Sequence, residues 1–241
     1  MAKILTTAQM RAAEAAAIAS GAVSGLELME RAGQGVVAAV RAVWPGLVAA
    51  RAVVLCGPGN NGGDGYVVAR LLAALGWDVF VLATAAPERL PPDAAANARR
   101  WRAVGGRIGD YDAPHLRDLL CESDRDTVLI DALLGIGQDR RCDALLAPLN
   151  AALDHCRKVL PGAALHVVAV DLPTGYDADT GAVLADAPVK PDLTVTFHAE
   201  KPVHQILRSG GYAVVVKDIG LAAGSDPAPG PTASVQPREA P

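Results

Sequence analysis

Residues 57–66, Gly-Pro-Gly-Asn-Asn-Gly-Gly-Asp-Gly-Tyr, combine residue types that can hold an anionic ligand. Glycines let a backbone adopt positive φ and approach a ligand closely, and free amides at a helix start attract phosphate. An apolar run, 51–56, precedes this segment and a helix-like run, 66–75, follows it. We predict a nucleotide or phosphate cradle here, because an ordinary tight turn between a strand and a helix needs fewer glycines.

Oxygen-bearing side chains accompany the cradle. Asn60, Asn61 and Asp64 offer oxygens that coordinate hard cations or bind sugar hydroxyls. Two later apolar runs end in Asp131 and Asp171, and an aspartate in such a place either caps a turn or faces a ligand. Ligands of open α/β sheets bind beyond the carboxyl ends of the strands, so we expect these aspartates to share one crevice with the cradle.

The elements that must position these residues alternate along the chain. Thr6 or Thr7 caps a predicted helix over 8–20, and Ser24 caps a second helix with an apolar stripe from Leu26 to Val40. After these, strands are predicted at 51–56, 78–84, 127–131, 165–171, 193–198 and 212–217, and helices at 65–75, 92–104, 113–121 and 143–157. The pattern indicates an α/β fold, a Rossmann-like three-layer αβα sandwich with a mostly parallel central sheet and two extra N-terminal helices.

Composition narrows the class of protein. With 241 residues, 51% of them hydrophobic, and a net charge of −4, the chain is expected to form one domain over 1–220. The Pro/Ala-rich segment 221–241 is expected to be a disordered tail or a linker. No uninterrupted apolar stretch of about 18 residues predicts a membrane span, and mild acidity argues against a nucleic-acid partner. The four cysteines lack CxxC spacing, which favours buried thiols in a reduced, cytoplasmic protein.

Two common nucleotide-binding classes fit poorly. Gly57, Gly59 and Gly62 satisfy the G-x-G-x-x-G pattern of dinucleotide binding. The second strand of such a unit should end in an acidic residue that holds the ribose, but here it is followed by Ala85-Ala86-Pro87. No Gly-Lys-Ser/Thr follows the cradle either. A conventional dehydrogenase and a Walker-type NTPase are therefore both disfavoured.

Four motifs in order resemble those of the NAD(P)H-hydrate epimerase family, also called the YjeF N-terminal domain. They are Asn60 to Gly65 (NNGGDG), Asp131 to Gly137 (DALLGIG), Asp171 to Gly175 (DLPTG), and Thr194 to Phe197 (TVTF) with Lys201-Pro202. Met10 to Glu14 (MRAAE) and Leu28 to Gly33 (LMERAG) extend the similarity over about residues 5–220. Thr174 stands where the family usually has serine, and 138–141 is more charged than the typical form.

The resemblance implies a repair enzyme that interconverts the R and S forms of NADHX and NADPHX, the hydrated forms of the reduced nicotinamide cofactors. A partner dehydratase then acts on the S form. It implies potassium ligands at Asn61, Asp131 and Thr174, and Asp171 at the nicotinamide end. The residues that it implies in substrate binding, besides Asp171, are Asn60, Asn61, Gly62, Gly63, Asp64, Gly135, Ile136, Gly137, Gln138, Asp139, Arg140 and Arg141.

For the chemistry, we hypothesise that Asp171 is the catalytic residue, the general acid and base at the hydroxyl-bearing carbon C6, assisting loss and return of water through an iminium-like or a ring-opened intermediate. Arg140 or Arg141 is expected either to pair with a phosphate or to be a solvated surface charge. Lys201 is expected either to reach the crevice and meet a phosphate or to be a turn residue before Pro202. His198 and His204 lack a catalytic motif around them and are expected to be structural.

Alternatives stay open at the level of the whole chain. A binding or scaffolding module of the same fold would lack catalysis, but the presence of Asp64, Asp131 and Asp171 favours an enzyme. The chain is expected to be either a stand-alone epimerase or one domain of a longer bifunctional protein. The amphipathic N-terminal helices exceed what one core needs, which suggests a homodimer.

Overall fold

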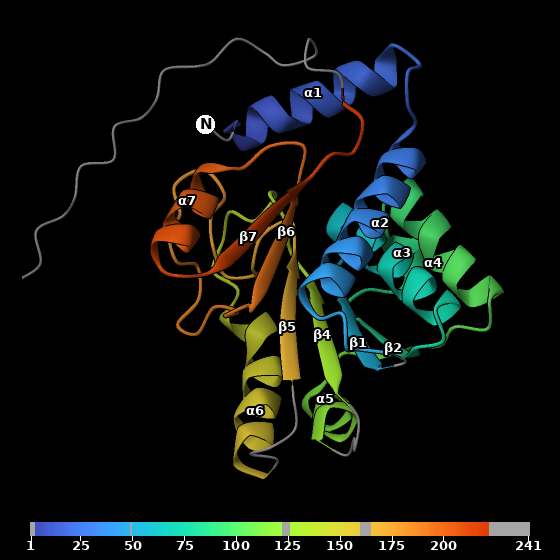
Figure 1. The fold of residues 1–241 in the computed structure, drawn as a ribbon, viewed down its shortest axis with the longest axis vertical. Helices are drawn as coiled ribbons and strands as arrows, with labels where there is room; N and C mark the ends of the chain where they lie inside the picture. Colours follow the sequence, from blue (N-terminus) through green and yellow to red (C-terminus); the bar gives the residue numbers. More distant parts are fainter. Residues whose placement is uncertain (1–2, 49, 122–125, 160–164, 222–241) are drawn as a thin grey trace, which may run out of the picture.

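The computed structural model describes residues 3–48, 50–121, 126–159 and 165–221. A sheet of seven strands, all parallel, forms its centre in the order β3-β2-β1-β4-β5-β6-β7 (Figure 1). The strands are β1 (Arg51–Cys56), β2 (Asp78–Ala83), β3 (Ile108–Asp110), β4 (Thr127–Ala132), β5 (Leu165–Val170), β6 (Leu193–Phe197) and β7 (Ala213–Lys217). The predicted parallel sheet is confirmed.

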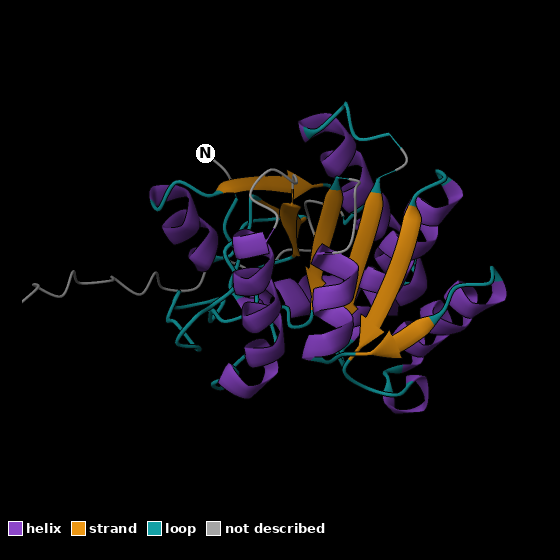
Figure 2. Ribbon diagram, turned by 90° about the horizontal axis from the view of Figure 1, so that it is seen from below, coloured by secondary structure: helices purple, strands orange, loops and turns teal. Residues whose placement is uncertain are grey.

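Helices cover both faces of the sheet, as Figure 2 shows. They are α1 (Thr7–Ala19), α2 (Gly25–Val43), α3 (Asn60–Ala74), α4 (Pro92–Ala103), α5 (Ala113–Cys121), α6 (Asp143–Val159) and α7 (Pro202–Ser209), with a 3₁₀ turn η1 (Pro87–Arg89). Helices α2, α3 and α4 contribute to one hydrophobic cluster with the sheet, and α5 and α6 to another. The three-layer αβα architecture with two extra N-terminal helices is thus confirmed.

Helix α1 lies across the end of the sheet where β6 and β7 finish (Figure 1). Thr6 caps it, since the Thr6 side chain accepts a hydrogen bond from the Gln9 amide and Gln9 bonds back to the Thr6 amide. Ser24 caps α2 in the same reciprocal way with Glu27. The backbone of Leu5 donates to the Glu200 carbonyl at 2.8 Å, so the chain before α1 is tied to the segment after β6. Helix α1 therefore partly covers the carboxyl ends of the strands.

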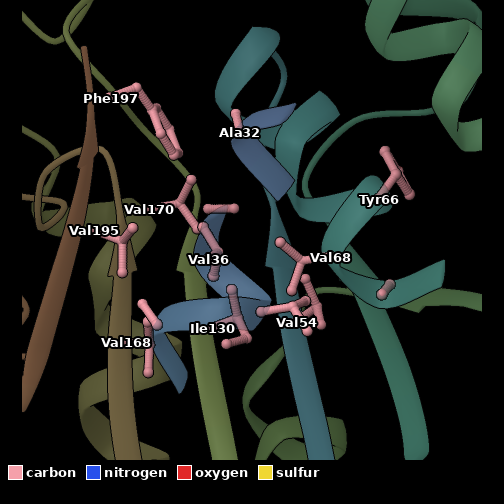
Figure 3. Packing of buried hydrophobic residues seen from close by; sticks show 14 of the residues in the cluster. Ala32, Val36, Val54, Tyr66, Val68, Ile130, Val168, Val170, Val195 and Phe197 are labelled. Carbon is pink, nitrogen blue, oxygen red and sulfur yellow. The ribbon is translucent and has the colours of Figure 1, made fainter. Parts of the chain in front are cut away.

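The core is built from small aliphatic side chains. Val36 of α2, Val54 of β1, Val68 of α3 and Ile130 of β4 are fully buried and pack together between α2, α3 and the sheet (Figure 3). Strands β1 and β4 are buried almost throughout, as expected for central parallel strands covered on both faces. Such a core makes a rigid frame for the loops at the carboxyl ends.

Several elements differ from the prediction. Helix α3 begins at Asn60 and not at residue 65, because the amides of the cradle continue directly into the helix and Gly63 N–H donates to the Gly59 carbonyl. Strand β3 and helix α7 were missed, since three residues are too few to show a period and α7 begins at a lysine-proline pair. Most other helix and strand bounds differ from the prediction by one or two residues. The predicted tail, apart from Leu221, lies outside the described residues.

The prediction of four reduced, buried thiols is wrong for two of them. Cys121, at the end of α5, and Cys156, in α6, form a disulfide with an S–S distance of 2.07 Å. Helices α5 and α6 pack side by side, which brings together two cysteines 35 positions apart, a spacing with no sequence pattern. Cys56 and Cys142 are free and buried, as predicted. Among the described residues, no helix is long and apolar enough to span a membrane.

Candidate active site

A cavity of about 590 Å³ opens at the carboxyl ends of β1, β4, β5 and β6. The cradle contributes Pro58 to Asn61 and Asp64, and the loop after β4 contributes 133–138. Asp171 follows β5, while Phe197 and Lys201 come from the end of β6 and the segment after it. The remaining lining residues are Met10, Arg11 and Glu14 of α1, and Pro91. The structure therefore brings the cradle and Asp171 into one crevice, as the sequence predicts.

The glycines of the cradle permit close packing of backbone on backbone. A Cβ on Gly57 would lie 1.6 Å from the Leu133 carbonyl oxygen, and one on Gly62 would lie 2.1 Å from the Gly57 carbonyl oxygen. At the start of α3, the N-cap residue Gly59 has no side chain to bond the first amides of the helix. These amides are available to an anionic ligand.

The backbone at Asp171 has a strained conformation. Asp171 has a φ of 65°, and Leu172 N–H donates to the Val170 carbonyl at 2.9 Å across it. His198 has a φ of 61° after the neighbouring strand, and Ala199 N–H bonds the Phe197 carbonyl in the same way. A bond from residue i to i+2 across a residue of positive φ is the pattern of the rare γ-turn. The turn directs Asp171 toward the cavity rather than along β5.

A buried ion pair holds the Asp171 carboxylate. Lys201 is 1% exposed, and its Nζ lies 2.7 Å from Asp171 Oδ1 and 2.8 Å from Thr196 Oγ1. The Thr196 hydroxyl donates to the same Asp171 oxygen at 3.0 Å. Burial raises the pKa of Asp171, but Lys201, His204 and Thr196 outweigh it and leave that pKa below its usual range. The resting carboxylate is therefore ionised.

His204 is buried beside this pair. Its Nε2 lies 2.8 Å from the Asp171 carbonyl oxygen, and its Nδ1 accepts the backbone N–H of Lys201 at 2.8 Å. Burial lowers the pKa of His204, although the nearby Asp171 opposes that change. Sequence reasoning expected a structural histidine and did not predict this contact with the site.

Two further carboxylates face the same cavity. Burial raises the pKa of Glu14, and the negative charge of Asp171 adds to this. Burial raises the pKa of Asp64 well above its ordinary value, with added repulsion from Asp171 and Glu14. The site thus holds an ionised carboxylate beside groups that favour the protonated form, a pattern that supports proton transfer.

Asp131 and Thr174 lie beneath the cavity, not in its lining, and bond to each other. Thr174 donates from its amide to Asp131 Oδ2 and from its hydroxyl to Asp131 Oδ1, each at 2.8 Å. Burial raises the pKa of Asp131 to about 6, against the lowering effect of the Thr174 hydrogen bonds. In the described part of the chain, the Asn61 Nδ2 atom is buried without a partner. That nitrogen is a hydrogen-bond donor and cannot ligate a cation, but the side-chain oxygens of Asn61, Asp131 and Thr174 are the ligand type that potassium takes, so these residue types fit it.

The charged end of the loop after β4 lies away from the cavity. Gly135, Ile136, Gly137 and Gln138 line it, but 139–141 do not. Asp139 and Arg140 are paired at the surface, with side chains 79% and 90% exposed. Arg141 bonds Asp143 and Asp186. Arg140 and Arg141, which were expected either to bind a phosphate or to be surface charges, thus pair with carboxylates outside the cavity in this structure.

Sequence reasoning missed Arg11, Glu14 and Thr196 as parts of the site. Arg11 comes from α1, and its guanidinium lies 3.1 Å from the position of a Cβ on Gly137. The MRAAE motif contained Arg11 and Glu14, but only the packing of α1 over the strand ends reveals that they face the cavity. Thr196 lies in the TVTF motif, but all of β6 is buried, so the motif alone does not show which of its side chains meets Asp171. Lys201, left open between two readings, is the ion-pair partner of Asp171.

The chain is similar to known proteins over most of its length. The chain is 50% identical to an NAD(P)H-hydrate epimerase of Cereibacter sphaeroides, over 88% of this chain and all of that protein. It is 49% identical to an NAD(P)H-hydrate epimerase of Rhodobacter capsulatus, over 92% of this chain and all of that protein. It is also 39% identical to the bifunctional NAD(P)H-hydrate repair enzyme Nnr of Escherichia coli, over 73% of this chain and 31% of that protein.

A solved structure shares the fold. The crystal structure of the yeast protein YNL200c superposes with a TM-score of 0.74 at 23% identity, covering 89% of this chain and 88% of that chain. The family model described as "YjeF-related protein N-terminus" matches residues 25–203, which include the cradle, Asp131, Asp171 and Lys201. Motifs, fold and relatives agree, and the chain belongs to the YjeF-related protein N-terminus family.

Proposed function

We infer that this chain is an NAD(P)H-hydrate epimerase, an isomerase that interconverts the R and S forms of NADHX and NADPHX. The observation that carries this inference is the similarity to three epimerases at 44–50% identity over most of the chain. The geometry agrees with it: an ionised, anchored carboxylate faces a cavity beside a glycine-rich helix start.

For the reaction we propose that Asp171 moves the proton at C6 of the hydrated nicotinamide ring. Because the carboxylate is ionised at rest, it takes the proton of the C6 hydroxyl. The oxygen electrons then form the C6=O bond while the C6–N1 bond breaks, and the proton passes from Asp171 to N1. Rotation about C5–C6 and reclosure by the reverse steps give the other epimer. Positioned proton transfer contributes about 10²–10⁴-fold in rate.

Lys201 and Thr196 support this chemistry through Asp171. Their hydrogen bonds go to the Oδ1 atom, and no described residue bonds Oδ2. Oδ2 is therefore the oxygen available to the substrate. Lys201 also keeps the resting carboxylate ionised at neutral pH.

We further propose a potassium ion held by Asn61, Asp131 and Thr174. Bound there, the ion would supply positive charge that fixes the cradle against the loop after β4. The support is the chemistry of the donor set, because the side-chain oxygens of Asn61, Asp131 and Thr174 are the ligand type that potassium prefers. We expect replacement of potassium by lithium to weaken nucleotide binding and to lower the melting temperature. Equal binding and melting in both salts would contradict a potassium site.

Other parts of the proposal concern partners and location. The match to about a third of a bifunctional repair enzyme supports a separate or fused dehydratase that consumes the S form. A homodimer and a cytoplasmic location remain proposals from the sequence.

To test the function, R-enriched NADPHX is incubated with the protein, and chromatography measures how fast the mixture reaches the R/S equilibrium. We expect purified protein to accelerate it over a protein-free control. Folded protein that binds NADPHX without acceleration would instead identify a non-catalytic nucleotide-binding module.

A further inference from the structure

His204 contacts both members of the buried ion pair through their backbones, and it is 0% exposed. It is the third residue of α7, and its Nδ1 accepts the N–H of the N-cap residue Lys201 at 2.8 Å. On the other side of the ring, Nε2 lies 2.8 Å from the carbonyl oxygen of Asp171. One imidazole therefore links the start of α7 to the turn after β5.

These two contacts define the protonation state of the ring. A backbone N–H only donates, so Nδ1 must be bare, and a carbonyl oxygen only accepts, so Nε2 must carry the proton. Burial lowers the pKa of His204, which keeps the ring neutral at neutral pH. A second proton on Nδ1 would face the Lys201 N–H, so the cationic form does not fit this geometry.

The contact with Asp171 occurs where the backbone is strained. Asp171 has a φ of 65°, a conformation that a non-glycine residue keeps only where its surroundings enforce it. The Asp171 N–H is held by the Val195 carbonyl at 2.8 Å, and the Asp171 carbonyl is held by His204. The backbone on both sides of the Asp171 side chain is thus anchored, once by β6 and once by α7.

We propose that His204 is a positioning residue for the epimerisation, a neutral donor that holds the Asp171 turn so that the carboxylate faces C6. This inference rests on the proposed role of Asp171. It assigns the histidine a function through the aspartate and no contact with the substrate. Loss of the hydrogen bond from Nε2 should therefore reduce turnover more than substrate binding.

Two substitutions separate the two contacts of the ring. In His204→Asn the amide oxygen lies as many bonds from Cβ as Nδ1 does, so the cap on Lys201 is kept and the donor to Asp171 is lost. In His204→Gln the amide nitrogen lies as many bonds from Cβ as Nε2 does, so the donor to Asp171 is kept. If His204 were purely structural, kcat would not depend on which of the two hydrogen bonds a substitution keeps.

The experiment measures kcat, KM and melting temperature for both variants and for Gln205→Asn, an exposed neighbour on α7 that serves as a control. We expect His204→Asn to lose about 10–100-fold in kcat with KM little changed. We expect His204→Gln to melt lower but to keep kcat within about threefold of wild type. Equal kcat in the two His204 variants would overturn the proposal. An inactive wild-type protein would instead contradict the proposed function.

A second measurement does not depend on the folding of a variant. Nitrogen-15 spectra of the wild-type imidazole distinguish the two neutral tautomers and the cation. We expect a protonated Nε2 and a bare Nδ1 for His204. A ring protonated on Nδ1 near neutral pH, either as the other tautomer or as the cation, would overturn the proposal.

Discussion

At the scale of single residues, the site places like charges close together. Asp64 faces Asp171 and Glu14, and burial with this repulsion raises its pKa well above the ordinary value of 3.8. The folded state then binds a proton that the unfolded state releases, so this group lowers stability as pH rises from about 4 through its folded pKa. Such strain is typical of a functional site.

Asp64→Asn should therefore stabilise the protein, with an advantage in melting temperature that is small near pH 4 and grows toward pH 8. Thermal unfolding at several pH values measures this. The matched control is Asp118→Asn, an exposed carboxylate paired with Arg117, which should show no such growth. A constant or shrinking advantage for the Asp64→Asn variant would contradict the electrostatic description of the cavity.

Arg11 is the residue of the cavity that we expect to bind the anionic part of the substrate. Among the described residues its guanidinium forms no ion pair, whereas Lys201, the other basic residue of the cavity, is engaged with Asp171. We expect Arg11→Gln to raise KM for NADPHX about tenfold with kcat unchanged. Arg140→Gln, at a 90% exposed position, is the matched control. A larger KM effect at Arg140 than at Arg11 would contradict this role of Arg11 and support the phosphate contact expected for Arg140 from the sequence.

The residue scale also shows what a sequence can reveal about a site. Asp171 was predicted because it ends an apolar strand, and strand ends of parallel sheets converge. The role of Lys201 could not be predicted, since its contact with Asp171 spans 30 residues and depends on the turn that follows β6. Arg11 and Glu14 belong to a recognisable motif, but their position over the cavity depends on how α1 packs.

At the scale of elements, the turn between β1 and α3 is packed against the loop after β4. A Cβ on Gly57 would meet the Leu133 carbonyl, which is backbone and has no rotamer to adopt. We expect Gly57→Ala to cost about 3 kcal/mol of unfolding free energy. Gly59→Ala, with no heavy atom within 4 Å of its Cβ, should cost below about 1 kcal/mol. Similar denaturation midpoints for the two variants would contradict this packing.

The pairing of α5 with α6 makes a second prediction at this scale. Unfolded protein without reductant should show two reactive thiols, from Cys56 and Cys142, and four after reduction. Closing a loop of 35 residues is worth about 4 kcal/mol in the chain-entropy model, so reduction should lower the unfolding free energy by up to that amount. Four reactive thiols without reductant would favour the reduced protein expected from the sequence.

The sequence predicted element boundaries well where a capping residue or a hydrophobic run marked them clearly. Ser24 and Thr6 cap helices as their residue types predict, and β1 and β4 follow apolar runs. The start of α3 was misplaced because its first turn is rich in glycine and asparagine, which normally indicate a loop. The three-residue strand β3 exists only through its pairing with β2, which is a tertiary effect.

At the scale of the whole molecule, a parallel sheet collects loops from distant segments at one edge. The cradle after β1, the loop after β4, and Asp171 after β5 meet there. Helix α1, near the N-terminus, adds three side chains to the same cavity. The alternation of strands and helices was enough to predict this architecture. The proposed epimerisation depends on one member of this assembly, the Asp171 carboxylate.

Replacement of that carboxylate by an amide is the most direct measurement. Asp171→Asn should lower the rate of NADPHX epimerisation about 10²–10⁴-fold while the Kd for NADPHX stays near the wild-type value. A circular dichroism melt must accompany the assay, because the substitution leaves Lys201 without its buried partner. A slow but folded and nucleotide-binding variant is the predicted result. Epimerisation at the wild-type rate by Asp171→Asn would contradict the assignment of Asp171 as the group that moves the proton.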